Sequence, residues 1–509
     1  MNKIVLNIIS AAFVSSFGCV NAQKDRPNIL FIMSDDHATQ AISCYGKEPL
    51  RNVISTPNID RIAAEGIRLD NCFVTNSIST PSRAAIITGQ YSQLNGVYTL
   101  ADEIDPNLPT MIKEFGESGY QTAIVGKWHL QTEPSYFDYY NVLPGLGRYH
   151  NPILKEKENL TGENFKQATG TVHQGHSTDI ITDEAIRWLT KTDSQKPFLL
   201  LCHFRAPHRE WEPAERFKSL YEDIVIPEPE NLYDNYAGKG ESVKNLRLML
   251  EHMNKADLKT DIPQGMSVNE FRRWAYQIYI KDYLRCVAGV DENVGRLLKY
   301  LEDNHLLDNT VIVYTADQGF FLGEHGFFDK RLMYEESLRM PCMIRYPKKI
   351  KSGQVNKDIV LNIDFAPTLL DFAGIKTPKY MQGKSFLPNL QRKTPVNWRK
   401  NMYYRYWLNA DRAHNVTAHY GIRDNRYKLI FYYGQALGMS NARTSNTTPE
   451  WEFYDLQSDP MEMNNQYNNP DYKEIIRKMK LELIKIKKQY KDEDSKYPEM
   501  KDIINRYYW

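Results

Sequence analysis

An excess of charge of either sign is missing from this sequence of 509 residues. It contains 64 Lys and Arg residues against 63 Asp and Glu residues, a formal charge of +1 at pH 7. Proteins that bind nucleic acid usually carry a strong basic excess, so this balance argues against a nucleic-acid partner. Any anionic ligand must therefore be bound by a local cluster of cations. The apolar share of 42% is that of a globular protein and excludes wholesale disorder.

Cysteine is scarce as well, with six residues in the whole chain. Their spacing indicates neither a disulfide framework nor a zinc site, so we expect free, buried thiols with at most one bridge. Five of them follow the first 22 residues, at Cys44, Cys72, Cys202, Cys286 and Cys342.

Apolar runs long enough to span a bilayer are absent, so we expect no transmembrane anchor. The N-terminus instead carries Lys3, a short apolar stretch over residues 4–14 and a small-residue site at 20–22. This order predicts a signal peptide over residues 1–22 and a secreted, periplasmic mature protein. Lipidation at Cys19 is the alternative interpretation, although the sequence around it fits a lipobox poorly.

Several short apolar runs share one pattern, in which the run ends in polar or charged residues. Such runs are typical of strands buried on both faces of a parallel sheet. They cover residues 28–33, 122–125, 198–202 and 311–314, and helical patterns lie between them, for example over 56–65, 108–118 and 178–190. The alternation predicts an α/β sandwich with a mostly parallel central sheet. Because function in such sheets gathers beyond the carboxyl ends of the strands, the polar ends are candidate site residues.

Residues 396–509 show a different pattern, with short antiparallel strands and one charged helix. We expect a catalytic domain over residues 23–395 and a smaller α+β C-terminal subdomain over 396–509. The helix is expected over 471–491, with its apolar stripe on the core and its lysines on a solvated face. A loop-rich insert from 209 to 270 is expected to lie over the site. The strands are expected over residues 402–408, 419–423, 428–433 and 451–455.

The segment Ser79-Thr80-Pro81-Ser82-Arg83 points to the chemistry. Pro81 favours a turn, and residues 84–88 predict the first turns of a helix. Ser79 would then lie close to a helix N-terminus, where backbone N–H groups and the helix dipole favour anions. Arg83, one turn further, can reach the same place. Taken alone, Ser79 is more simply explained as a helix cap.

Residues 79–89 resemble the signature of the type I sulfatases, in which a Cys or Ser followed by x-Pro-Ser-Arg is oxidised to formylglycine. The resemblance covers most of the chain and implies an alkaline-phosphatase-like α/β domain with a small C-terminal domain. Gln318 departs from the family pattern, since relatives commonly carry Asn or His there. The further motifs, in the family's order, are Ser34-Asp35-Asp36-His37, Gly126-Lys127-Trp128-His129, Ala206-Pro207-His208, Asp317-Gln318-Gly319, Lys330 and residues 452–460.

The resemblance also implies a modified residue and a metal site. A maturase would oxidise Ser79 to formylglycine (3-oxoalanine), and this residue would share the metal with four side chains. Those side chains offer oxygen ligands, which suit a hard cation, calcium before magnesium. The expected metal ligands are Asp35, Asp36, Ser79, Asp317 and Gln318.

The same resemblance gives roles to cations and histidines. Hydrolysis of a sulfate ester passes through a crowded, negatively charged transition state, so electrostatic stabilisation should be the largest contribution. Arg83, Lys127 and Lys330 are expected to hold the charge of the sulfate. His129 is expected to act as a base, and His208 to protonate the leaving oxygen of the sugar.

The stretches around His208 and Asp317 resemble the sulfatases that act on N-acetylglucosamine 6-sulfate in mucin or heparan-type glycans. We therefore expect a sulfated glycan as the substrate and removal of its 6-O-sulfate as the reaction. His414, Asn415 and His419 are expected to contact the sugar. The alternative is that their segment simply forms a hairpin of the small domain.

Two other functions remain open at this point. A phosphoester hydrolase of the same superfold would usually use paired transition metals with more His ligands, which the oxygen-rich set disfavours. A sulfated-glycan-binding protein without turnover would result if Ser79 were not oxidised, because an unmodified serine hydroxyl is a weak nucleophile that needs activation.

Overall fold

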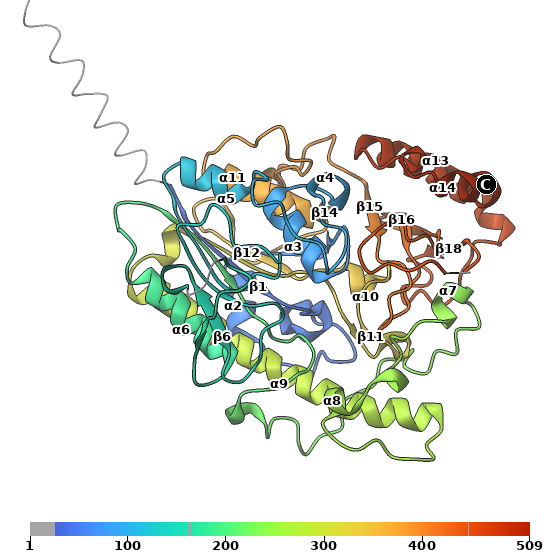
Figure 1. The fold of residues 1–509 in the computed structure, drawn as a ribbon, viewed down its shortest axis with the longest axis horizontal. Helices are drawn as coiled ribbons and strands as arrows, with labels where there is room; N and C mark the ends of the chain where they lie inside the picture. Colours follow the sequence, from blue (N-terminus) through green and yellow to red (C-terminus); the bar gives the residue numbers. More distant parts are fainter. Residues whose placement is uncertain (1–25, 161–163, 446) are drawn as a thin grey trace, which may run out of the picture.

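The computed structural model describes residues 26–160, 164–445 and 447–509, with a ten-stranded sheet at its centre (Figure 1). The four predicted apolar runs form neighbouring parallel strands in its middle: β9 (Thr310–Ala316), β1 (Asn28–Ser34), β8 (Phe198–His203) and β4 (Gln121–Lys127). The strand β5 (Tyr139–Leu143) adds a fifth parallel member. The edges are β6 (Ile153–Glu156) and β7 (Thr171–Val172) on one side, and β12 (Cys342–Arg345), β2 (Ile67–Leu69) and β13 (Gln354–Asn356) on the other.

The register of these strands brings their carboxyl ends to one place. Met33, near the end of β1, lies opposite His203 of β8 and Thr315 of β9. Beyond the strands, the Asp35 N–H donates to Ala206 O at 3.3 Å, and the Asp317 N–H donates to Ser34 O at 3.3 Å. The polar residues beyond three separate strands are therefore joined through the backbone.

Helices cover both faces of the sheet and complete a three-layer sandwich (Figure 1). One face packs against α2 (Pro57–Ala64), α6 (Ser177–Leu189) and α9 (Val268–Asp303). The other packs against α3 (Ser79–Thr88), α5 (Met111–Glu117) and α11 (Phe365–Phe372). The shorter helices are α4 (Ser92–Asn95), α7 (Glu241–Lys244), α8 (Lys255–Leu258), α10 (Glu335–Leu338) and α12 (Leu387–Leu390).

Two helices differ from the sequence expectations. The helix α5 begins at Met111 rather than at 108, because Pro109 disfavours helical backbone in the residue before it. The 36-residue helix α9 was not predicted; a capping box between Ser267 and Glu270 starts it. Its buried face includes three tyrosines, Tyr276, Tyr279 and Tyr283, all 0% exposed, which interrupt the apolar stripe in the sequence.

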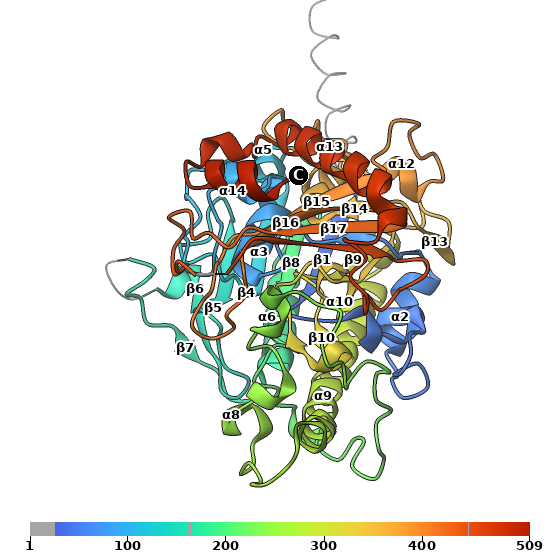
Figure 2. The same cartoon turned by 90° about the vertical axis from the view of Figure 1, so that its right-hand side faces the viewer.

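The C-terminal region forms a separate four-stranded antiparallel sheet, as predicted: β15 (Asn401–Tyr406), β16 (His419–Asp424), β17 (Tyr427–Tyr432) and β18 (Glu450–Asp455). Its outer side is covered by α13 (Lys473–Gln489) and α14 (Met500–Tyr507) (Figure 2). Its β15 edge meets the segment before α3, where Arg405 N–H donates to Thr75 O at 3.1 Å and Tyr404 Oη accepts from Ser77 N–H at 3.1 Å. Two short ladders pair β3 (Cys72–Phe73) with β14 (Val360–Leu361) and β10 (Phe321–Leu322) with β11 (Phe328–Asp329).

The predicted α/β sandwich with a small antiparallel C-terminal sheet is thus confirmed. The predicted signal peptide over 1–22, including Cys19, lies outside the described residues, and the domain boundary near Pro395 stays a prediction. In the described part of the chain, no helix combines the length and the apolarity needed to cross a membrane.

Candidate active site

The helix α3 begins at Ser79, five residues before the predicted first turn at Ala84, and Ser79 is not its cap. Ile78 is the N-cap residue, and no side chain among the described residues caps this helix. The Ser79 side chain is 2% exposed and its Oγ donates to Asp35 Oδ1 at 3.3 Å. The hydroxyl is thus directed at a carboxylate beyond the end of β1, with the positive end of the helix dipole behind it.

Three carboxylates meet beside this hydroxyl, and all are 0% exposed: Asp35, Asp36 and Asp317. Asp36 has a φ of 63°, a left-handed conformation that Asp tolerates better than most residues. Its N–H donates to Asp317 Oδ1 at 3.1 Å. The Gln318 amide donates to Asp317 Oδ1 at 2.8 Å and also to Asp36. The unpredicted helix α9 supports this turn, because Tyr283 Oη donates to Asp36 O at 2.7 Å.

Each carboxylate has a cation of its own. Lys127, at the end of β4, pairs with Asp35. Lys330 Nζ lies 2.7 Å from Asp36 Oδ2. The Arg83 guanidinium, one turn into α3, places Nη2 3.0 Å from Asp317 Oδ2 and 3.7 Å from Asp35 Oδ1. These three cations are at most 4% exposed, so their charge is little screened by water.

Burial and neighbouring charges shift the pKa values of the three carboxyl groups. Burial raises the pKa of Asp36 to about 7, with Lys330 opposing the rise and Asp35 adding to it. Burial and the Asp35 charge together raise the pKa of Asp317 to about 6, with Arg83 opposing the rise. Burial acts on Asp35 too, but Lys127 and the other cations outweigh it and hold the pKa well below its usual range. A bound cation would relieve this repulsion between carboxylates.

The donor set fits a hard divalent cation. Ligand atoms of Asp35, Asp36 and His208 all lie within 4.8 Å of one another. Gln318 Oε1 is buried and finds no hydrogen-bond partner among the described residues, so an amide oxygen is free to serve as a ligand. Three carboxylates and an amide oxygen are the donors that calcium and magnesium prefer.

Two predicted histidines flank the cluster. His129 follows β4 with a φ of 58°, and its buried Nδ1 has no hydrogen-bond partner within the described ranges. His208 is held by a hydrogen bond between its Nδ1 and Arg209 O, which leaves Nε2 3.7 Å from Asp36 Oδ2. Burial lowers the pKa of both rings well below its usual value; Lys127 lowers that of His129 further, whereas Asp35 opposes the shift at His208. A bound anionic ester would raise both pKa values and favour proton uptake.

The three residues expected to contact the sugar differ in their neighbours and in their burial. His414 lies next to the lysine segment: its Nε2 is 3.4 Å from Asp329 Oδ2, and its Nδ1 is 2.8 Å from Asp411 Oδ1. Asn415 donates to Asn245 O at 2.8 Å. His419 is 0% exposed inside the C-terminal sheet, so it offers no surface to a ligand in this structure. The rings around it are Tyr404, Tyr406 and Tyr432.

The two residues that flank Lys330 were not predicted from the sequence. Asp329 and Arg331 have φ values of 78° and 91°, and Asp329 Oδ1 accepts from the Lys330 N–H at 2.8 Å. Arg331 lies 3.2 Å from His414 Nε2. In the sequence, Asp-Lys-Arg is typical of a solvated charged turn, and only the family motif at Lys330 marks it as functional.

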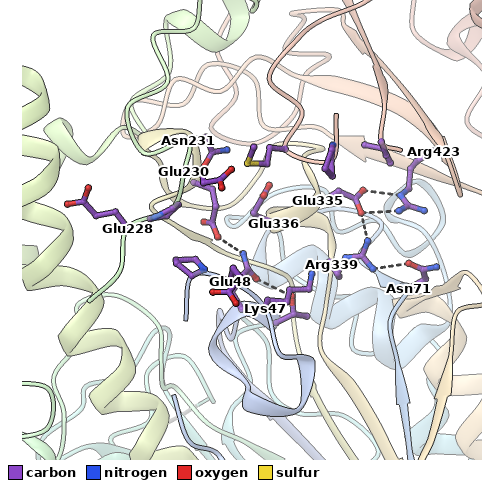
Figure 3. Close-up of a pocket in the computed structure, with 18 of the residues that line it drawn as sticks. Lys47, Glu48, Asn71, Glu228, Glu230, Asn231, Glu335, Glu336, Arg339 and Arg423 are labelled. Carbon is purple, nitrogen blue, oxygen red and sulfur yellow. Dashed lines mark hydrogen bonds and ion pairs between the residues drawn. The ribbon is translucent and has the colours of Figure 1, made fainter. Parts of the chain in front are cut away.

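Cavity size does not locate this site. A cavity of about 820 Å³ lies between α10 and residues 228–231 and is lined by several Glu residues, Arg339 and Arg423 (Figure 3). No predicted site residue is among the described residues that line it. A second cavity, of about 470 Å³, is lined by Trp128 and His129 and so adjoins the cluster of carboxylates and cations.

Matches to models of known families show to which family the chain belongs. The family model described as "Sulfatase" matches residues 27–375, and "N-sulphoglucosamine sulphohydrolase, C-terminal" matches residues 323–489. The chain belongs to the sulfatase family. This sulfatase is therefore an enzyme that hydrolyses sulfate esters, and its fold is the alkaline-phosphatase-like sandwich of its structural neighbours. Enzymes of this family generally use a metal ion and formylglycine.

Individual relatives resemble this sulfatase over nearly its whole length. An N-acetylglucosamine-6-O-sulfatase of Bacteroides thetaiotaomicron is 42% identical, covering 98% of this chain and 92% of the relative. An arylsulfatase of Clostridium perfringens is 27% identical, covering 90% and 94%. A solved structure described as a complex with its substrate, D-glucosamine-2-N,6-O-disulfate, is 43% identical with a TM-score of 0.84, covering 94% and 100%.

Proposed function

We propose that this sulfatase removes the 6-O-sulfate of N-acetylglucosamine or related glucosamine residues in mucin or heparan-type glycans. The observation that carries the proposal is the meeting of Ser79, three buried carboxylates and three cations at the ends of neighbouring strands. The sugar and the sulfate position are inferred from the names of the 42% identical relative and of the 43% identical substrate complex. The cavity beside His129 is large enough for a pyranose ring.

The geometry suggests a role for each side chain. Arg83, Lys127 and Lys330 bind the sulfate oxygens, because they are the cations that face the Ser79 side chain across the carboxylates. His129, with its free Nδ1, takes a proton at the nucleophile, and His208 Nε2 donates one to the leaving sugar oxygen. His414 acts near the sugar through the Lys330 segment.

Two groups complete the proposed site. A calcium ion, with magnesium the second choice, would be held by the five predicted ligands and would supply positive charge to the sulfate. Formylglycine made from Ser79 by a maturase would supply the attacking hydroxyl group in place of a weakly nucleophilic serine. The five ligands are Asp35, Asp36, the residue at 79, Asp317 and Gln318.

The same proposal includes export and processing. Cleavage after residue 22 would release a periplasmic or secreted enzyme whose catalytic domain and C-terminal subdomain divide near Pro395. Lys3 and the apolar stretch after it support the signal peptide. Lipidation at Cys19 remains the alternative route of export.

The test is an assay of protein co-expressed with a formylglycine-generating maturase. We expect release of sulfate from N-acetylglucosamine 6-sulfate and little from the 3-sulfate or from galactose 6-sulfate. Faster turnover of aryl phosphate than of aryl sulfate would favour the phosphoester alternative. Mass analysis of the peptide that contains Ser79 should show the loss of about 2 Da that converts the hydroxyl to a carbonyl. An unmodified peptide with retained glycan binding would favour the non-catalytic alternative.

A further inference from the structure

A third pocket lies far along the chain from the predicted site motifs, on the C-terminal subdomain. It measures about 380 Å³ and lies between the N-terminal half of α13 and the segment that starts at Tyr467. α13 covers the outer side of the C-terminal sheet (Figure 2). The described side chains that line the pocket include three cations and no carboxylate: Lys473, Arg477 and Lys480 are the cations. A lining of this kind selects an anionic ligand.

The cations share one face of α13 because they are spaced by four and three residues. Lys473 and Arg477 are exposed. Within the described residues Lys473 has no ion pair or side-chain hydrogen bond, and the ion pair of Arg477 is a 3.6 Å contact with Glu474. An exposed contact of this kind contributes little, so both charges are available to a ligand.

An aromatic wall completes the pocket. Trp509 is 69% exposed, although a large apolar ring is normally buried. Lys480, which also lines the pocket, contacts every ring of this wall: its Nζ donates to Tyr467 Oη at 2.8 Å and lies within 5.8 Å of four ring centroids. These rings belong to Trp451, Tyr467, Tyr508 and Trp509. An exposed indole presents a flat apolar face and a polar edge, which suit a pyranose ring.

We propose that this pocket is a second, non-catalytic binding site for a sulfated saccharide chain. Trp509 packs against a sugar ring, Lys473 and Arg477 bind its sulfate groups, and the exposed amide of Asn468 faces the hydroxyls. Such a site would hold a polymeric substrate while its end is processed elsewhere on the molecule. The choice of a sulfated saccharide rests on the proposed function, whereas the anionic selectivity rests on the pocket alone.

The test measures binding rather than turnover. Titration calorimetry in the Ser79→Ala background would use a 6-O-sulfated heparan-type tetrasaccharide, with the catalytic site saturated by N-acetylglucosamine 6-sulfate. We expect Lys473→Ala/Arg477→Ala to weaken the remaining binding about tenfold at low salt. Turnover of the monosaccharide, measured with Ser79 and the maturase present, should stay unchanged. A desulfated tetrasaccharide should bind much more weakly to the unsubstituted pocket.

The matched control removes the same charge from another face of the same helix, with Lys478→Ala/Lys485→Ala. Equal weakening of tetrasaccharide binding in the control variant would mean that any loss of positive charge on the helix has this effect, and it would overturn the proposal. An unchanged affinity in the pocket variant would overturn it as well. Trp509→Ala should weaken binding without changing its salt dependence. Displacement of the tetrasaccharide by single-stranded DNA at lower concentration would reject the saccharide. Failure of the proposed function would appear separately, as missing monosaccharide turnover in the unsubstituted enzyme.

Discussion

At the scale of single residues, the site balances buried charges one by one. Lys127 faces Asp35, Lys330 faces Asp36, and Arg83 faces Asp317 across 3.0 Å. Removal of one partner would leave its counterpart buried and unpaired, which typically costs about 3–5 kcal/mol. Loss of activity in a charge variant is therefore interpretable only when folding is measured beside it.

His208 gives a prediction that separates its chemical role from its structural one. His208→Ala should reduce kcat/KM for alkyl sugar sulfates by about 10²–10⁴-fold, because their leaving oxygen needs a proton. Aryl sulfates, whose leaving groups need little protonation, should lose far less. His129→Ala is the comparison and should slow both substrate types alike. Steady-state kinetics on both substrates checks this, and an equal loss in His208→Ala would remove the general-acid role.

A variant of Asp317 tests whether the site binds a metal ion. Asp317→Ala should abolish turnover and remove the rise in Tm that calcium gives, since a ligand at 100 times its Kd stabilises by about 2.7 kcal/mol. Asp291 is a buried carboxylate outside the site, where it accepts from the Ile59 N–H at 2.8 Å. Asp291→Asn should therefore lower Tm yet retain the calcium shift. Differential scanning fluorimetry with calcium and with chelator decides it, and calcium-independent melting of the wild type contradicts the assignment.

At the scale of elements, the sequence predicts the strand ends well and the turns beyond them poorly. The apolar runs of β1, β4, β8 and β9 are short, bounded and buried on both faces, so their carboxyl ends could be located without coordinates. The path of the chain beyond each strand depends on turns, and the hydrophobic periodicity of the sequence does not reveal their geometry. The approach of His208 to Asp36 and the positive φ values around Lys330 belong to that class. The helix α9 was not predicted for another reason, because three tyrosines interrupt the aliphatic stripe of its buried face.

The contact between α10 and residues 317–320, the loop that follows β9, yields a prediction at this scale. A Cβ on Gly319 would lie 2.1 Å from Glu336 O and 2.7 Å from Arg339 O, both backbone atoms that cannot yield. Gly319→Ala should therefore destabilise the protein by about 3 kcal/mol or more and displace Gln318. Gly116→Ala, in α5 with no described atom within 4 Å of the new Cβ, should be neutral or stabilising by up to about 1 kcal/mol. Denaturant unfolding of both variants measures the difference.

At the scale of the whole molecule, one hydrophobic core joins the two sheets. A single cluster of buried residues includes Phe31 of the central sheet and Phe431 of the C-terminal sheet. Buried ion pairs cross the same junction, where Glu335 of α10 meets Arg423 at 2.9 Å and Lys428 at 3.0 Å. Because the sheets share this core, a local protonation at the junction should be visible in the unfolding of the entire chain.

Glu336, beside that junction, predicts how whole-molecule stability depends on pH (Figure 3). Burial, with the charges of Glu324 and Glu462, raises its pKa to about 8. A carboxyl whose pKa in the folded state lies above its unfolded value of about 4.5 does not lower the free energy of unfolding below pH 4.5. As the pH rises toward 8, this carboxyl lowers the free energy of unfolding more and more, because it then ionises freely only in the unfolded chain. Glu336→Gln should therefore match the wild type at pH 4.5 and exceed its free energy of unfolding by about 4 kcal/mol at pH 8, since a pKa difference of one corresponds to about 1.4 kcal/mol. Urea unfolding across this range measures it, and a difference that stays constant with pH would assign Glu336 an ordinary, ionised state.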